Sequence, residues 1–377
     1  MPSAAWHRAL FRTALGGVHV YAWIFVFQYF YVTFADTGEA LASTALTYAL
    51  TQVTAVLLTP YGAGRIRHGI RRGMWLGTAA AALGFAVLGL ALVGSFGTVG
   101  WGITIFAVLM GVYRALYWTP YEVERNGTSS RGLDIAMAFV PTITGLLLAV
   151  GFPIHVQLFC GAALCIAALI ALRDVPERYE GYVWKYRETF HELFATENRI
   201  TITRMVLDGI EGTALLLVWP ITIFLIFDWS YAILGIVLTI TLLATYTLRA
   251  VMRRMNLGNI PTFALATLAG SAWVMRLVVA SPVGVVLVDT YFLAGRPETR
   301  GHDASAYEQT AENRTFVDEV TALKEMGMGI GRTILCIIVA LVAWGGTFGA
   351  AAFTAFIAAA VAAILSVLIA RSTHRVV

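Results

Sequence analysis

The sequence predicts an all-α integral membrane protein with twelve transmembrane helices in two pseudo-repeated six-helix bundles. Of its 377 residues, 59% are apolar and 13% are charged, whereas charged residues make up about 25% of an ordinary soluble domain. With a mean hydropathy of +0.76, the chain has too little polar surface to cover a globule in water. Its apolar runs are also about as long as the roughly 20 residues that a membrane-spanning helix needs. Most classes of soluble enzyme are therefore excluded.

In the first half of the chain, polar, Gly or Pro residues bound six apolar runs, which is typical of successive spans. The runs are residues 14–35, 40–61, 73–94, 99–118, 133–154 and 156–172. The fifth run contains Pro141, which a transmembrane helix tolerates as a kink.

The second half repeats this count of six. Its runs are residues 200–227, 230–248, 260–280, 282–295, 326–344 and 348–370. The tenth run is the shortest and contains Asp289. We expect it to extend into flanking residues or to pack deep in the bundle, because charge within a bilayer is costly.

A long polar stretch divides the chain into three parts. We predict a first bundle over residues 1–172, a linker over residues 173–199 and a second bundle over residues 200–377. Apolar side chains recur in the linker at helical spacing, which fits either an amphipathic helix on the membrane surface or a plain linker helix. They are Tyr182, Val183, Tyr186, Phe190, Leu193 and Phe194. A second polar segment covers residues 296–324.

The distribution of cations predicts the orientation, since cytoplasmic loops collect Lys and Arg. Alternate connections carry the arginines, for example Arg8 before the first span and Arg65 after the second. The other set carries Asp36 and Asp228 and no Lys or Arg. We therefore predict a multi-pass protein of the plasma or inner membrane with both termini in the cytoplasm.

Other classes of protein are disfavoured by what the sequence lacks. The formal net charge of +4 is small, which argues against a nucleic-acid partner. The three cysteines lie in apolar runs, where cysteine usually acts as a small hydrophobe. The seven histidines are scattered, and no Gly-x-x-x-x-Gly-Lys-Ser/Thr loop is present. We expect neither a metal, nor a cofactor, nor an ATP-driven motor.

One cationic loop carries a family resemblance. The stretch after the second span reads GAGRIRHGIRR from Gly62 to Arg72. It is similar to the Gly-x-x-x-Asp-Arg-x-Gly-Arg-Arg/Lys loop of the major facilitator superfamily. Gly62, Arg67, Gly69 and Arg71 fall in register, whereas an isoleucine, Ile66, stands at the acidic position. By this resemblance, the four matching residues would belong to the gating machinery.

The resemblance implies a secondary transporter that works by alternating access around a central site. Its expected partners are a small-molecule substrate, the lipid bilayer and protons, and we expect a monomer. A lipid or amphiphile flippase on the same fold is the alternative within this class. A membrane-embedded enzyme and a transport-dead receptor are alternatives from other classes.

Ionisable side chains within the spans favour a polar interior, because such residues normally face a cavity or a partner. Glu211 has no partner at helical spacing and could take up a proton on one side and release it on the other. Asp289 and Asp208 are comparable candidates for proton coupling. Two structural roles are the alternatives to proton coupling. Asp208 could pair with Arg204, four residues earlier on one helix, and Asp289 could form a salt bridge to Arg276 across the turn at Ser281.

Substrate contacts are expected from the spans that would line a central site. The candidates are Trp23, Gln28, Tyr113, Arg114, Tyr117 and Trp219. Arg114 could hold an anionic substrate bidentately, or it could pair with Glu122 or Glu124 in an inner gate. The aromatic side chains suit a ligand with ring or apolar surfaces, although Trp and Tyr also anchor spans at membrane interfaces.

Overall fold

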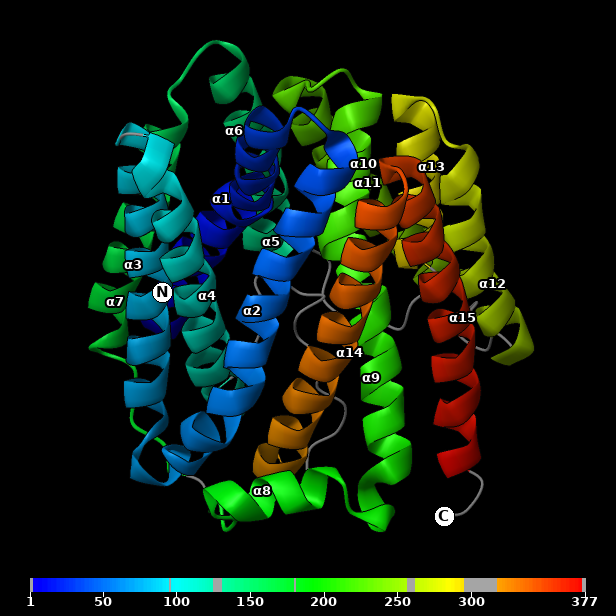
Figure 1. Cartoon of the computed structure of the whole chain (residues 1–377). Helices are drawn as coiled ribbons and strands as arrows, with labels where there is room; N and C mark the ends of the chain where they lie inside the picture. The colour runs from blue at the N-terminus through cyan, green and yellow to red at the C-terminus, as the bar shows by residue number, and fades with distance from the viewer. Residues whose placement is uncertain are drawn as a thin grey trace.

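The computed structural model describes residues 3–94, 96–124, 131–179, 181–255, 262–294 and 317–374, and most of these residues lie in helices (Figure 1). Much of the second polar segment predicted above, residues 296–316, lies outside the described residues. Nine helical segments are long and apolar enough to cross a membrane, and three shorter apolar ones accompany them in the described part of the chain. The predicted all-helical membrane class is confirmed.

The helices of the first half are α1 (Ser3–Phe34), α2 (Thr37–Gly64), α3 (Ile70–Val93), α4 (Phe96–Glu124), α5 (Arg131–Ala138), α6 (Val140–Ala149) and α7 (Ile154–Leu172). Several of them, such as α1 and α4, run beyond the predicted apolar windows. Their polar ends continue the helix because backbone hydrogen bonding does not depend on hydropathy. The predicted fifth span is divided into α5 and α6 at Phe139, two residues before Pro141.

The helices of the second half are α9 (Arg199–Thr213), α10 (Trp219–Ile226), α11 (Tyr231–Arg254), α12 (Thr262–Met275), α13 (Pro282–Ala294), α14 (Val317–Gly345) and α15 (Phe348–His374). A π-helical turn, Ala214–Val218, joins α9 to α10, and a 3-10 turn, Arg276–Val278, follows α12. Pro220 accounts for the wide turn, since it lacks an amide hydrogen and its ring crowds the carbonyl four residues earlier, at Leu216.

The linker forms the short helix α8 (Tyr186–Leu193), which lies across one end of the bundle (Figure 1). We call this the α8 end. The helix covers only part of the predicted apolar spacing and begins after Lys185, whose amide donates to the Glu188 carboxylate at 2.8 Å and caps the helix there. The Tyr186 hydroxyl donates to the Leu57 carbonyl of α2 at 3.0 Å, and the Val183 amide donates to Glu319 of α14 at 3.0 Å. The linker is thus fastened to both halves of the chain.

Two pairs of helices cross with backbone against backbone. Where α9 meets α14, a Cβ on Gly209 would lie 2.2 Å from the Met328 carbonyl oxygen, and one on Gly331 would lie 1.9 Å from that of Val206. Where α6 meets α11, a Cβ on Gly145 would lie 2.3 Å from the carbonyl oxygen of Tyr231. Gly235 is placed in the same way, 2.3 Å from the carbonyl oxygen of Pro141. Small residues at such crossings let transmembrane helices approach closely.

We expect Gly331→Ala to lower the free energy of unfolding by about 1–3 kcal/mol, because the added methyl group must push α9 and α14 apart. The measurement is denaturant unfolding of the purified protein in detergent micelles. Gly16→Ala is the matched control, since nothing lies within 4 Å of its Cβ position. An equal loss in the two variants would contradict the close crossing.

Candidate functional site

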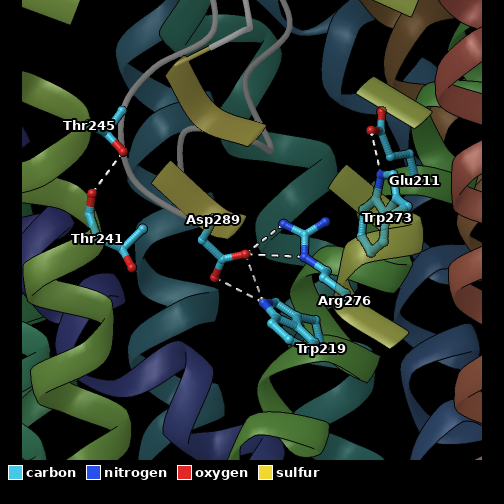
Figure 2. Close-up of polar contacts among 7 residues, drawn as sticks. All are labelled: Glu211, Trp219, Thr241, Thr245, Trp273, Arg276 and Asp289. Atoms are coloured by element: carbon cyan, nitrogen blue, oxygen red, sulfur yellow. Dashed lines mark hydrogen bonds and ion pairs between the residues drawn. The ribbon is translucent and has the colours of Figure 1, made fainter. Parts of the chain in front are cut away.

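A buried ion pair lies in the second half of the chain. Arg276 donates to Asp289 of α13 from Nη2 at 2.7 Å and from Nε at 3.1 Å. The indole Nε1 of Trp219 donates to the two carboxylate oxygens of Asp289 at 3.0 and 2.9 Å. Figure 2 shows Asp289 between these donors. The salt bridge that the sequence offered as an alternative role for Asp289 is therefore confirmed.

A second carboxylate belongs to the same cluster. Glu211 of α9 is 1% exposed and accepts a hydrogen bond from Trp273 Nε1 of α12 at 2.9 Å (Figure 2). The guanidinium carbon of Arg276 lies 4.0 Å from the ring centroid of Trp273 and 4.4 Å from that of Phe292. Cation–π contacts of this kind become stronger when the cation is desolvated. Arg276 thus connects the two carboxylates, and we call Glu211, Trp219, Trp273, Arg276 and Asp289 the carboxylate network.

Local chain geometry brings the carboxylate network together. Trp219 directly follows the π-helical turn, which changes the phase of the side chains after Glu211 by one residue. Trp273 and Arg276 are three residues apart and therefore share one face. The break after Val278 returns the chain into α13, so that Asp289 meets Arg276. By helix rise, Glu211 lies about 18 Å along α9 from Arg199, near the middle of the apolar helical segment Thr196–Ile226.

The interpretation of Glu211 as a carboxyl without a partner is wrong, because its partner is an indole 62 positions along the chain. Asp208 also has a partner on another helix, since Ser366 of α15 donates to its Oδ1 at 2.6 Å. Sequence spacing can reveal a charged partner on the same helix. It cannot reveal the indole of Trp273 or the hydroxyl of Ser366, because both lie on other helices.

Figure 2 also draws Thr241 and Thr245 of α11, where the Thr245 hydroxyl donates to the Thr241 carbonyl at 2.7 Å.

The network can perform two kinds of chemistry. Asp289 faces a permanent cation and the single indole N–H of Trp219, so it acts as the counter-ion of Arg276. The partner that Glu211 finds in Trp273 is a neutral donor, and an indole N–H can donate to either form of a carboxyl group. Among the described residues, no three His, Cys, Asp or Glu side chains are grouped so that they could hold a metal ion.

The six predicted substrate-binding residues do not form one cluster. Trp219 belongs to the carboxylate network. Gln28 accepts a hydrogen bond from the hydroxyl of Tyr231, near the end of α1 opposite its N-terminus. The ring of Phe11 packs against Tyr113 and Tyr117, with centroids 5.5 and 4.6 Å apart. Since 17 residues of α1 separate Phe11 from Gln28, the two positions are about 25 Å apart by helix rise, too far for one small ligand.

Tyr113 and Tyr117 belong to a buried aromatic cluster between α1, α4 and α7. The Tyr117 hydroxyl lies 3.1 Å from Nε2 of His7, whose Nδ1 lies 2.9 Å from the Ala168 carbonyl oxygen. The hydrogen bonds of His7 join α1 to α4 and α7, which is the arrangement of a packing contact.

Arg114 pairs with an acidic residue that the sequence did not suggest. Its Nη2 lies 3.8 Å from Oε2 of Glu325 on α14. The side chains of Glu122 and Glu124, proposed from sequence as partners, lie outside the described residues. Because α14 belongs to the second half, this ion pair spans the two halves of the chain. It also gives Arg114 a counter-charge from within the protein.

The four matching residues of the family-like loop lie between the last turn of α2, which holds Gly62, and the first turn of α3, which holds Arg71, at the α8 end. A Cβ on Gly62 would lie 2.3 Å from the Ala115 carbonyl oxygen of α4, and Gly69 has a φ of +112°. Arg71 forms an ion pair with Glu177, with Nε and Oε2 3.1 Å apart, and its amide donates to Oε1 at 2.9 Å. Arg67 is exposed. Glu177, from the linker, supplies a carboxylate to a loop that carries Ile66 at its acidic position.

Solved structures that resemble this one share its whole length. No family model matches the sequence, and no curated protein matches it. The structure of a POT family transporter, PepTSo, has a TM-score of 0.65 at 12% identity, covering 99% of this chain and 98% of that one. The nucleoside transporter NupG gives 0.62 at 14% identity, covering 97% and 99%. The human organic anion transporter MFSD10 gives 0.55 at 13% identity, covering 98% and 99%. This chain has the fold of the major facilitator superfamily transporters.

Proposed function

We propose that the chain is a secondary transporter that moves a small organic solute across a membrane by alternating access. The observation that carries the proposal is the carboxylate network, since charged side chains buried among membrane-spanning helices normally serve a transport or proton pathway. Similar solved structures are described as a nucleoside transporter, a peptide transporter and an organic anion transporter, which supports a small organic solute as the substrate class.

Twelve crossings follow if the three shorter apolar helices also span. These are residues Ile135–Ala149, Phe263–Val278 and Pro282–Leu293. The first six crossings would form a bundle over residues 1–172 and the last six a bundle over residues 200–377, with the linker between them. Cations concentrate at the α8 end, so we assign that end and both termini to the cytoplasm.

Contacts between the two halves occur near both ends of the helices. At the α8 end, Arg114 of α4 pairs with Glu325 of α14. Far from it, Trp229 packs on Phe27 and Tyr31 of α1, with centroids 5.9 and 4.7 Å apart. In alternating access, the Arg114–Glu325 contact would break while the Trp229 contacts remain formed, and the reverse would occur in the opposite state.

We assign proton coupling to Glu211. It is buried, its side chain hydrogen-bonds to a neutral donor, and it lies at the middle depth of the helices, where coupling sites of such transporters are found. Asp289 is better explained as the permanent counter-ion of Arg276, and Asp208 as a hydrogen-bond partner of Ser366.

Reconstitution into liposomes tests the proposed function. Vesicles loaded with a candidate solute are expected to accumulate the labelled solute from outside by counterflow without ATP. Binding without flux would contradict transport and favour a receptor, and conversion of the solute would favour a membrane-embedded enzyme. Translocation of a fluorescent lipid in place of the solute would favour the flippase alternative.

A further inference from the structure

A second buried arginine lies outside the carboxylate network. Arg332 is 1% exposed and lies about 22 Å along α14 from Val317 by helix rise, near the middle of the helix. Removing such a charge from water costs several kcal/mol unless a partner compensates it. Among the described residues, its one polar contact is from Nη1 to Oε1 of Gln52 at 3.5 Å, and its Nε has no acceptor. That distance is at the long limit of a hydrogen bond.

Two other buried donors, Gln52 on α2 and Trp23 on α1, also lack acceptors within the described part of the chain. Gln52 is fully buried at the middle of α2, and its Nε2 has no partner. One turn earlier on the same face of α2, Tyr48 packs edge-on against Trp23 with centroids 4.8 Å apart. The Trp23 Nε1 likewise has no partner.

A buried donor without an acceptor costs about 1–3 kcal/mol, so the three groups together point to a missing acceptor. The protein provides a carboxylate for each of two other buried arginines, Asp289 for Arg276 and Glu325 for Arg114. For Arg332 it provides none among the described residues. On the α9 side, the guanidinium faces Gly212, whose Cβ position is 3.6 Å from Nε and which contributes no side chain.

We infer that Arg332 and Gln52 bind an anionic group, a carboxylate or a phosphate, of the solute that the protein carries. The inference rests on the proposed function and names the chemistry of the substrate. A guanidinium holds such groups with two parallel hydrogen bonds, and Gln52 Nε2 supplies a further donor. Gln52 comes from the first half of the chain and Arg332 from the second, at the depth where a site between two rocking bundles is expected. The rings of Trp23 and Tyr48 would contact an apolar or ring portion of the solute.

Matched probes that differ in charge test the inference. The thermal unfolding midpoint of the purified full-length protein in detergent is measured with acetate and acetamide, benzoate and benzamide, and adenosine monophosphate and adenosine. We expect at least one anionic probe to raise the midpoint more than its neutral partner. Arg332→Gln should weaken that probe's binding about ten-fold or more, which corresponds to the loss of a charged hydrogen bond. If neither a soluble anionic probe nor a short-chain anionic phospholipid raises the midpoint more than its neutral counterpart, the inference is overturned.

Further variants separate binding from folding. Arg332→Lys keeps the positive charge and loses the two parallel N–H donors of the guanidinium, so we expect intermediate binding of the anion. Gln52→Leu should weaken binding of the same anion although Arg332 is intact. Thr333→Val is the matched control, because within the described residues the Thr333 hydroxyl bonds to the Gly329 carbonyl of its own helix alone, at 2.9 Å, and anion binding should persist. Full anion preference in the Gln and Lys variants of Arg332 would overturn the inference. A short-chain anionic phospholipid that stabilises the wild type where soluble anions do not would assign the same site to a lipid headgroup.

Failure of this inference and failure of the proposed function give different results. Arg332-dependent anion binding without counterflow would reject transport and retain the site. Counterflow that does not depend on solute charge, and is undiminished in Arg332→Gln, would reject the site and retain transport.

Discussion

Replacement of Arg276 by methionine is expected to lower the free energy of unfolding by about 3–5 kcal/mol. The variant leaves the Asp289 carboxylate buried without its counter-ion. It also removes the cation–π contacts to Trp273 and Phe292, whose ring centroids lie 4.0 and 4.4 Å from the guanidinium carbon. Denaturant unfolding in detergent micelles, followed by tryptophan fluorescence, provides the measurement.

A double variant shows whether the uncompensated charge is the cause. Arg276→Met combined with Asp289→Asn removes both charges and leaves an amide oxygen to accept from Trp219. We expect it to be more stable than Arg276→Met alone. Arg254→Met, at an exposed position on α11, is the surface control and should change stability by less than about 0.5 kcal/mol. A double variant no more stable than the single one would contradict the assignment of Asp289 as the counter-ion.

Replacement of Glu211 by glutamine is expected to abolish uptake driven by a pH gradient and to preserve counterflow. The glutamine retains an oxygen that can accept from Trp273 and loses the ability to exchange a proton. Uptake of a transported solute into proteoliposomes with an imposed pH gradient is compared with counterflow at uniform pH.

Two variants place limits on this result. Glu39→Gln, an exposed carboxyl at the start of α2, should leave both activities unchanged. Asp289→Asn should impair both, because it leaves Arg276 without its counter-ion. Unchanged gradient-driven uptake in Glu211→Gln would reject Glu211 as the coupling residue.

Much of the helical architecture follows from hydropathy, because a bilayer requires each crossing to be apolar over most of its length. An irregularity in the helix near Pro141 can be predicted from the proline itself. The π-helical turn before Trp219 cannot, since an extra residue in one turn changes the direction of side chains without changing composition. The start of α8 depended on the cap at Lys185, and the apolar spacing from Tyr182 onward carries no sign of it.

The candidate site could be predicted from sequence only where a charge has an opposite charge nearby. The Arg276–Asp289 pair met that condition, as the two are 13 positions apart across one turn. Trp273 and Glu211 did not, because a neutral indole on another helix leaves no charge pattern. Similarly, Glu325 is 211 positions from Arg114, so only the packing of α4 near α14 reveals their contact.

Arg276 and Arg332 have opposite electrical consequences for a protein in an energised membrane. Arg276 forms an electrically neutral pair with Asp289, whereas Arg332 has no carboxylate among the described residues and keeps its charge. Moving one elementary charge across the membrane is worth about 2.3 kcal/mol per 100 mV of potential. While no anion is bound, the membrane potential therefore changes the free energy of any displacement of Arg332 across the membrane. An anion bound there would cancel the charge, so the membrane potential would act chiefly on the return of the unloaded protein.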